Sequence, residues 1–136
     1  MSIHFIDARH EKNFENLKTA YHVNTEDKER VLLIYVLAGD EECYKHIDDI
    51  IEDDGGAVIK SESALHHSWV THSNKSMIRL AMHLYKWDTP TAYGLTEPQD
   101  IQKELHGYTP YRLFYYLDER MRDVAFEAIK MFVYGH

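Results

Sequence analysis

The chain has 136 residues, of which 44% are apolar and 12% aromatic, and its formal net charge is −8. This length and composition suit one domain with a buried core, so a single domain over residues 1–136 is predicted and disorder is not. Residues 1–60 carry a net charge of −7 and residues 61–136 carry −1, which makes binding of nucleic acid over the whole surface unfavourable.

The sequence also lacks the marks of membrane insertion and secretion. Its longest uninterrupted apolar segment is Val31–Ala38, whereas a membrane-spanning helix needs about 20 residues. The N-terminus is neither basic nor followed by an apolar stretch of signal-peptide length. Cys43 is the only cysteine, so no internal disulfide forms. These features predict a cytoplasmic protein with no membrane span.

Two helices are predicted at the start of the chain. The first runs from about Ala8 to His22, with Asp7 as its N-cap, and its apolar positions keep helical spacing: Phe14, Leu17 and Tyr21. The second begins after Asn24, includes Val31–Ala38 and ends at Gly39. Because the second helix is apolar on all sides, we place it at the centre of a bundle. The β-branched residues in this segment leave a buried strand as the alternative.

A third helix is predicted from Asp40, which can cap it, to the glycine pair Gly55-Gly56. Its apolar face consists of four residues: Cys43, Ile47, Ile50 and Ile51. The segment Ala57–Ile59 then predicts a short strand that pairs with Ile3–Phe5.

In the second half, a short helix is predicted from about Glu62 to Trp69, with Ser61 as its cap. A longer helix follows, capped by Ser73 and ended by Asp88–Pro90. Its apolar stripe contains Met77, Leu80, Ala81, Leu84 and Tyr85.

After a loop over residues 88–96, a helix is predicted from about Glu97 to Leu105, ended by Gly107. Thr109 and Pro110 then supply an N-cap and an N1 proline for the last helical region. Asp118 can divide this region, so one helix or two are both consistent with the sequence. The fold class predicted is all-α: a compact bundle of six to eight helices around a buried central helix, with at most one short two-strand pair.

Ten histidines raise the question of a metal site. Helical zinc motifs place two histidines four residues apart, and no two histidines have this spacing here. The clustered members are His66, His67 and His72, with His83 further along. An acidic run lies on the outer face of the predicted third helix (Asp48, Asp49, Glu52, Asp53, Asp54), and it lacks the order of a calcium loop. The sequence therefore predicts no metal site and no cofactor.

Patterns for covalent catalysis and phosphate-binding glycine loops are absent as well. The serines near the histidines lack a nucleophile-elbow pattern, and Cys43 lies on an apolar helix face, where a thiol is usually inert. Lys75 and Arg79 lie four residues apart on one helix face. Other basic residues of the second half can extend this positive surface: Lys86, Arg112, Arg120 and Arg122. Simple solvation of these charges is the alternative.

The segment Ser68–Ser76, with its pattern Trp-x-Thr-x-Ser, is followed by Arg79–Ala81. With the early His10-x-x-x-Phe14 and the late Tyr108–Pro110 leading to Phe114, it resembles a family of small proteins of Gram-positive bacteria and their prophages to which no function is assigned. The resemblance spans most of the chain and implies no activity. Physically, the Trp-x-Thr-x-Ser pattern fits a helix exit, a turn and the cap of the next helix.

Aromatic and arginine side chains are enriched among the anchors of recognition surfaces. The candidate ligand- or partner-binding residues are therefore Trp69, Thr71, Arg79, His66, His67, His72 and His10.

The sequence predicts a non-enzymatic protein-interaction module that binds a protein partner or self-associates, as in a homodimer. This prediction depends on the missing catalytic patterns and on an aromatic second half: Tyr108, Tyr111, Phe114, Tyr115 and Tyr116. The alternative is a metal-dependent small hydrolase that uses histidine or acidic residues. Nucleic-acid binding through the basic residues of the second half is a less favoured hypothesis, and it predicts salt-sensitive retention on heparin.

Overall fold

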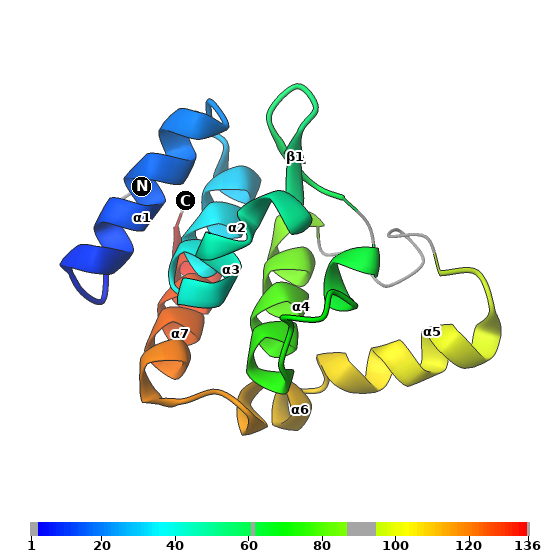
Figure 1. The fold of residues 1–136 in the computed structure, drawn as a ribbon. Helices are drawn as coiled ribbons and strands as arrows, with labels where there is room; N and C mark the ends of the chain where they lie inside the picture. Colours follow the sequence, from blue (N-terminus) through cyan, green and yellow to red (C-terminus); the bar gives the residue numbers. More distant parts are fainter. Residues whose placement is uncertain (1–2, 61, 87–94, 136) are drawn as a thin grey trace.

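The structure is a computed structural model that describes residues 3–60, 62–86 and 95–135. Within these residues the chain forms seven α-helices and one antiparallel strand pair (Figure 1). The elements are α1 (Ala8–Ala20), α2 (Lys28–Ala38), α3 (Glu41–Lys45), β1 (Ile51–Asp53), β2 (Ala57–Ile59), α4 (His72–Lys86), α5 (Pro98–Leu105), α6 (Pro110–Tyr115) and α7 (Glu119–Tyr134). Short 3-10 turns join some of them. The predicted all-α class with one short strand pair is confirmed.

The central position of α2 is also confirmed, and the alternative strand does not occur. Every side chain from Val31 to Ala38 is at most 1% exposed. The helix contacts α1, α3, α4 and α7, and Figure 1 shows α1 and α4 on either side of it. Because burial of one large aliphatic side chain contributes roughly 1.5–3 kcal/mol, this segment contributes a large share of core stability.

Two aspartates and one threonine cap helices at the positions predicted from the sequence. Asp7, Thr109 and Asp118 each accept a hydrogen bond from the backbone N–H three residues later. Asp118 resolves the open question after Pro110, because it ends one helical segment and starts another. The last region therefore contains two helices, α6 and α7.

The start of the second helix was predicted three residues too early. Asn24 accepts a hydrogen bond from the Glu26 backbone within a turn, at 2.8 Å, and the N-cap is Asp27. Gly39 ends the helix as predicted but with φ −81°, so left-handed backbone is not the reason for glycine. A Cβ there would lie 2.6 Å from both methyl carbons of Val124, so close packing of α7 requires glycine.

The prediction of a long third helix was wrong. α3 ends at Lys45, and β1 follows after a 3-10 turn. The strand partner was wrong as well, since Ala57–Ile59 pairs with β1 and not with Ile3–Phe5. Gly55 and Gly56 have φ values of +72° and +126°, which favour glycine. These two glycines reverse the chain directly after β1, so the partner of Ala57–Ile59 is the neighbouring strand β1.

The region before α4 also differs from its prediction. The helix expected over residues 62–69 is only a 3-10 turn, Glu62–Leu65. The cap of α4 is Thr71, whose hydroxyl accepts a hydrogen bond from the Asn74 backbone at 3.4 Å. Ser73 lies inside the first turn and donates to the Tyr116 carbonyl at 2.8 Å, so its predicted role as cap was wrong.

The helix predicted over residues 97–105 is confirmed as α5. Predictions on the Ser61 cap, the helix stop at Asp88–Pro90 and most of the 88–96 loop lie outside the described residues. In the part of the chain that the structure describes, no helix has both the length and the apolar composition that a bilayer span requires.

Asp40 organises a buried polar cluster at the N-termini of α3 and α4. The Asp40 carboxylate is 1% exposed and accepts hydrogen bonds from the Glu42 and Cys43 backbone and, at both oxygens, from the Asn74 amide at 2.9 and 3.1 Å. The neighbouring Cys43 is fully buried, and this burial raises the pKa of its thiol well above the ordinary value. The predicted apolar placement of this thiol is confirmed.

Arg120 joins α7 to the N-terminus of α1 and the C-terminus of α2. Its guanidinium donates to both oxygens of Asp7, at 3.1 and 3.3 Å, and to the Gly39 carbonyl. The hydrogen bonds from Arg120 and from the α1 backbone hold the pKa of Asp7 below its ordinary value. One carboxylate therefore caps α1 and anchors α7.

A basic pocket between α4, α5 and α6

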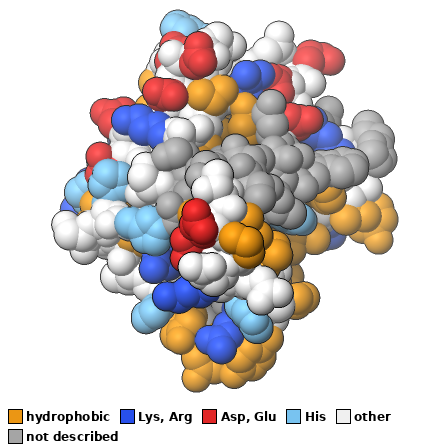
Figure 2. Space-filling view, turned by 90° about the vertical axis from the view of Figure 1, so that its right-hand side faces the viewer, with side chains coloured by type: hydrophobic (Ala, Val, Ile, Leu, Met, Phe, Trp, Pro, Cys, Tyr) orange, Lys and Arg blue, Asp and Glu red, His pale blue; other side chains and the backbone are white. Residues whose placement is uncertain are grey.

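On the side of α4 away from α1, where α5 lies (Figure 1), residues of α4, α5 and α6 line a pocket of about 670 Å³. We call it the basic pocket. Figure 2 views the molecule from this side, and its lower half shows basic and histidine side chains around an acidic one. The lining residues are His66, His72, Lys75, Ser76, Arg79, Leu95, Asp100, Lys103, Glu104, His106, Gly107, Arg112 and Tyr116. A volume of this size is typical of small-ligand sites.

The pocket lining is positive although the chain is acidic. It contains four cationic side chains and two carboxylates, so its net charge is +2 with its three histidines neutral. The whole chain, in contrast, carries −8. A concave surface of one sign concentrates the field and attracts ligands of the opposite sign.

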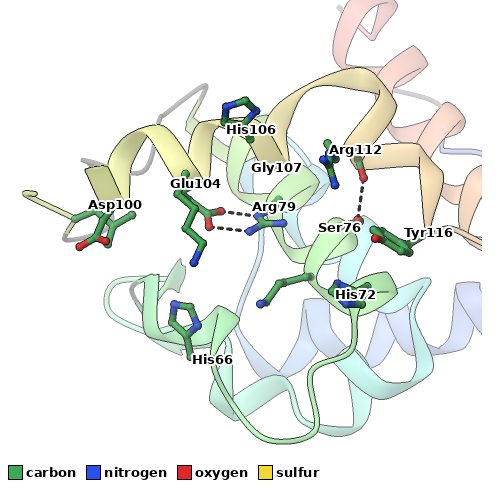
Figure 3. Close-up of a pocket in the computed structure, with 13 residues that line it drawn as sticks. His66, His72, Ser76, Arg79, Asp100, Glu104, His106, Gly107, Arg112 and Tyr116 are labelled. Carbon is green, nitrogen blue, oxygen red and sulfur yellow. Dashed lines mark hydrogen bonds and ion pairs between the residues drawn. The ribbon is translucent and has the colours of Figure 1, made fainter. Parts of the chain in front are cut away.

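The Arg79 guanidinium forms the floor of the pocket and is already paired. Its Nη2 donates to Glu104 Oε1 at 2.7 Å and its Nε donates to Oε2, as Figure 3 shows. The two side chains are only 18% and 9% exposed. Gly107 makes this possible, because a Cβ there would lie 2.5 Å from the Arg79 Cζ. This two-bond ion pair joins α4 to α5 and neutralises the charge of Arg79.

The other three cations of the lining are not neutralised in this way. Lys75 comes from α4, Lys103 from α5 and Arg112 from α6. Among the described residues, none of them lies within ion-pair distance of a carboxylate. Ser76 donates to the Arg112 carbonyl at 3.4 Å and so ties α6 to α4. The pocket therefore presents three available positive charges from three helices.

An aromatic pair forms one wall. The rings of His72 and Tyr116 stack with centroids 4.7 Å apart and planes 18° apart, and they lie side by side in Figure 3. Tyr116 is 38% exposed, and beyond it Tyr111 and Tyr115 are 67% and 56% exposed. An aromatic surface with hydroxyl groups thus continues from the pocket across α6.

The structure brings three of the seven predicted site residues to this pocket: His66, His72 and Arg79. Trp69, Thr71 and His67 lie on the preceding segment and do not line it. The Trp69 indole N–H donates to Asp49 Oδ2 at 2.9 Å, and His67 Nδ1 lies 3.9 Å from the same oxygen. Thr71 caps α4. These contacts attach the segment before α4 to the 3-10 turn Ile47–Asp49.

His10, the seventh predicted residue, lies in the core between α1 and α2. It is 0% exposed, and its Nε2 is 2.9 Å from the Tyr35 carbonyl while its Nδ1 accepts from the Ile6 backbone at 3.4 Å. A carbonyl only accepts, so Nε2 carries the hydrogen and the ring is neutral. Burial lowers the pKa of His10 below its ordinary value.

Among the described residues, no three histidine, cysteine or acidic side chains converge on a point that could hold a metal ion. The pocket offers N–H donors of lysine, arginine and histidine, which suit an anion. The sequence missed Lys103, His106 and Glu104. The only signal for them was the polar C-terminal end of the predicted 97–105 helix together with His106, which follows it three residues after Lys103.

The chain belongs to a family of unknown function, DUF6075, whose model matches residues 1–136. Neither the curated proteins nor the solved structures contain a significant match to the chain. The expected occurrence of the family in Gram-positive bacteria and prophages stays a prediction.

Proposed function

We propose that this protein is a non-enzymatic interaction module that binds an acidic segment of a partner protein at the basic pocket. The observation that carries the proposal is the set of three available cations, Lys75, Lys103 and Arg112, which line one pocket. In a chain of net charge −8, such a set attracts an acidic ligand only locally. The location we propose is the cytoplasm.

The exposed tyrosines beside the pocket support a protein partner. The rings of Tyr111 and Tyr115 lie 5.2 Å apart in a tilted arrangement, and Tyr115 meets Tyr116 edge-on at 4.9 Å. Tyrosine supplies a large rigid contact surface with a polar tip, and such residues are enriched at interfaces. A partner segment that places carboxylates in the pocket can lay its apolar side chains across these rings.

A titration with a fluorescein-labelled glutamate-rich peptide, followed by fluorescence anisotropy, tests this proposal. We expect the wild type to bind the peptide, with an affinity that falls as salt is added, because screening weakens exposed charge interactions. Neutralising the pocket in the variant K75Q/K103Q/R112Q should reduce the affinity by about 10-fold or more, since hydrogen bonds to charged groups contribute about 1.5–3 kcal/mol each.

The matched control is K12Q/K18Q/R122Q, which removes the same charges from α1 and α7, outside the pocket. It should bind the peptide as the wild type does. Equal weakening by both triple variants would show that only net charge matters, and that result would overturn the proposal. Absence of binding by the wild type would overturn it as well.

We also propose self-association of the chain through the outer face of α7. Phe126, Val133 and Tyr134 are 58%, 48% and 78% exposed and share one helix face. Side chains of both signs flank them: Glu119, Arg122, Asp123 and Lys130. A second copy can therefore cover the apolar face and match its charges. Exposed apolar side chains gathered on one helix face are a surface that an interaction partner can bury.

Size-exclusion chromatography with light scattering over a range of concentrations tests this second proposal. The wild type should shift from monomer to dimer as concentration rises, and V133S/Y134S should remain monomeric. Tyr111→Ser, an equally exposed aromatic change on α6, is the control and should dimerise. A wild type that stays monomeric throughout would contradict self-association without touching the proposal for the basic pocket.

A further inference from the structure

We propose that the anion recognised by the basic pocket is a phosphate monoester dianion rather than a carboxylate. This inference rests on the proposed function, because it names the acidic group that the site takes. Three properties of the pocket support it: the size of its charge, the directions from which its donors come, and the pairing of Arg79.

The charge of the pocket matches a dianion. The lining has a net charge of +2 with neutral histidines, and a phosphate monoester carries about −1.5 to −2 at pH 7. One carboxylate would leave the lining positive. A phosphodiester of a nucleic-acid backbone carries a single charge per phosphate, so it matches the lining less well. A bound dianion is the smallest single group that neutralises the pocket.

The directions of the donors favour a tetrahedral group. Lys75, Lys103 and Arg112 approach from three different helices. A carboxylate presents two oxygens in one plane, which suits a single guanidinium fork. A phosphate monoester presents three terminal oxygens in different directions, so each of three donors can meet its own oxygen. Lysine, a point charge without planar geometry, binds such oxygens readily.

One of the two guanidinium groups that line the pocket already binds a carboxylate. The guanidinium fork of Arg79 is occupied by Glu104 through two hydrogen bonds, and the pair is held by the close approach of Gly107. At Arg79 an incoming carboxylate would have to compete with this internal one, so only the Arg112 guanidinium is left to bind it with two parallel hydrogen bonds. The phosphate does not need Arg79, because the three available cations suffice.

The phosphate can belong to a phosphorylated side chain of the partner or to a free small molecule. The chemistry of recognition is the same in both cases, and the experiment separates them. Isothermal titration calorimetry would compare inorganic phosphate, acetate, a phosphoserine peptide and the same peptide with glutamate in place of phosphoserine.

We expect phosphate to bind and acetate to bind at least about 10-fold more weakly, the ratio that follows from one lost charged hydrogen bond. The phosphoserine peptide should bind more tightly than the glutamate peptide. If the peptide also binds more tightly than inorganic phosphate, the source is a phosphorylated partner. If the two bind equally, the flanking chain adds nothing and the source is a free phosphorylated molecule. Both outcomes support the inference.

Single variants K75Q, K103Q and R112Q should each weaken phosphate binding by about 10-fold, whereas K12Q and R122Q should not. If the glutamate peptide binds as tightly as the phosphoserine peptide, the phosphate inference is overturned and the proposed interaction function stands. If phosphate binds equally to the wild type and K75Q/K103Q/R112Q, binding is adventitious and the inference is also overturned. Failure of every ligand would overturn both proposals.

Discussion

Adjacent residues of α4 serve two different polar regions. Asn74 is 3% exposed and its amide is bound to both oxygens of Asp40, whereas Lys75 lines the basic pocket and has no carboxylate partner among the described residues. Successive side chains on a helix point about 100° apart, so one helix turn faces both regions. In the Asp40–Asn74 cluster the polar atoms bind one another, so the cluster stabilises the fold. In the basic pocket the cations have no carboxylate partner among the described residues, so they are available to a ligand.

The largest effect on stability is expected in the buried polar cluster around Asp40. Asp40→Ala should lower the free energy of unfolding by about 3 kcal/mol, because it leaves the buried Asn74 amide without its acceptor and removes the cap of α3. Asp118→Ala removes only an exposed cap and should cost about 1 kcal/mol. Urea denaturation measures both values. Equal losses in the two variants would contradict the role given to the buried pair.

A pair of glycine variants sharpens the comparison. Gly39→Ala places a methyl group against Val124 in the core, and Gly107→Ala places one against the Arg79 guanidinium. Gly39→Ala should cost about 2 kcal/mol through overpacking, and Gly107→Ala should cost less, because the end of the Arg79 side chain can shift. Only Gly107→Ala should also weaken binding of the glutamate peptide, because it displaces the floor of the pocket. Denaturation and anisotropy on both variants separate the two effects, and loss of binding in Gly39→Ala would count against the assignment.

The neutral His10, buried between α1 and α2, gives the stability of the fold a pH dependence. Because burial lowers the folded-state pKa of His10 below 6.5, the unfolded chain takes up a proton that the folded chain does not. Stability should therefore be greatest above pH 6.5 and fall between pH 6.5 and 5.5, by at most about 1 kcal/mol. His10→Gln keeps a donor for the Tyr35 carbonyl but does not titrate. Its stability should change less over this interval, and parallel curves would refute the explanation.

The smallest effect on stability is expected when the available cations of the basic pocket are neutralised. The variant K75Q/K103Q/R112Q should change the free energy of unfolding by less than about 0.5 kcal/mol, as is usual for surface changes that break no buried contact. The same variant should lose most of its anion binding. A large loss of stability would mean that these side chains hold the fold, which would remove the difference between the two regions.

Local chemistry was sufficient to predict much of the fold. The apolar run Val31–Ala38 predicted the buried centre, and the caps Asp7 and Thr109 predicted two helix starts. The hairpin was missed because Cys43, Ile47, Ile50 and Ile51 keep helical spacing. The glycine pair at residues 55 and 56 competes with this pattern, because its positive φ values favour chain reversal.

The pocket was harder to predict than the fold. His66, His72 and Arg79 were chosen from one stretch of sequence, and helix packing does bring them to one pocket. Lys103 and Arg112 come from helices whose placement against α4 depends on tertiary contacts such as the Arg79–Glu104 pair. Trp69 and His10 have the same residue types as ligand-binding groups, but their partners are Asp49 and the Tyr35 carbonyl. Residue type alone cannot distinguish these two situations.

The burial of Cys43 supplies the protein with an internal reporter of opening. Its thiol is fully enclosed and is the only one in the chain, so a thiol reagent reacts with it only in molecules that have transiently exposed the α3 region. The labelling rate in native buffer then gives the free energy of that opening without denaturant. Since the Asp40 carboxylate accepts from the Cys43 backbone, the same measurement would detect loosening of the buried polar cluster in a variant too subtle to shift a melting curve.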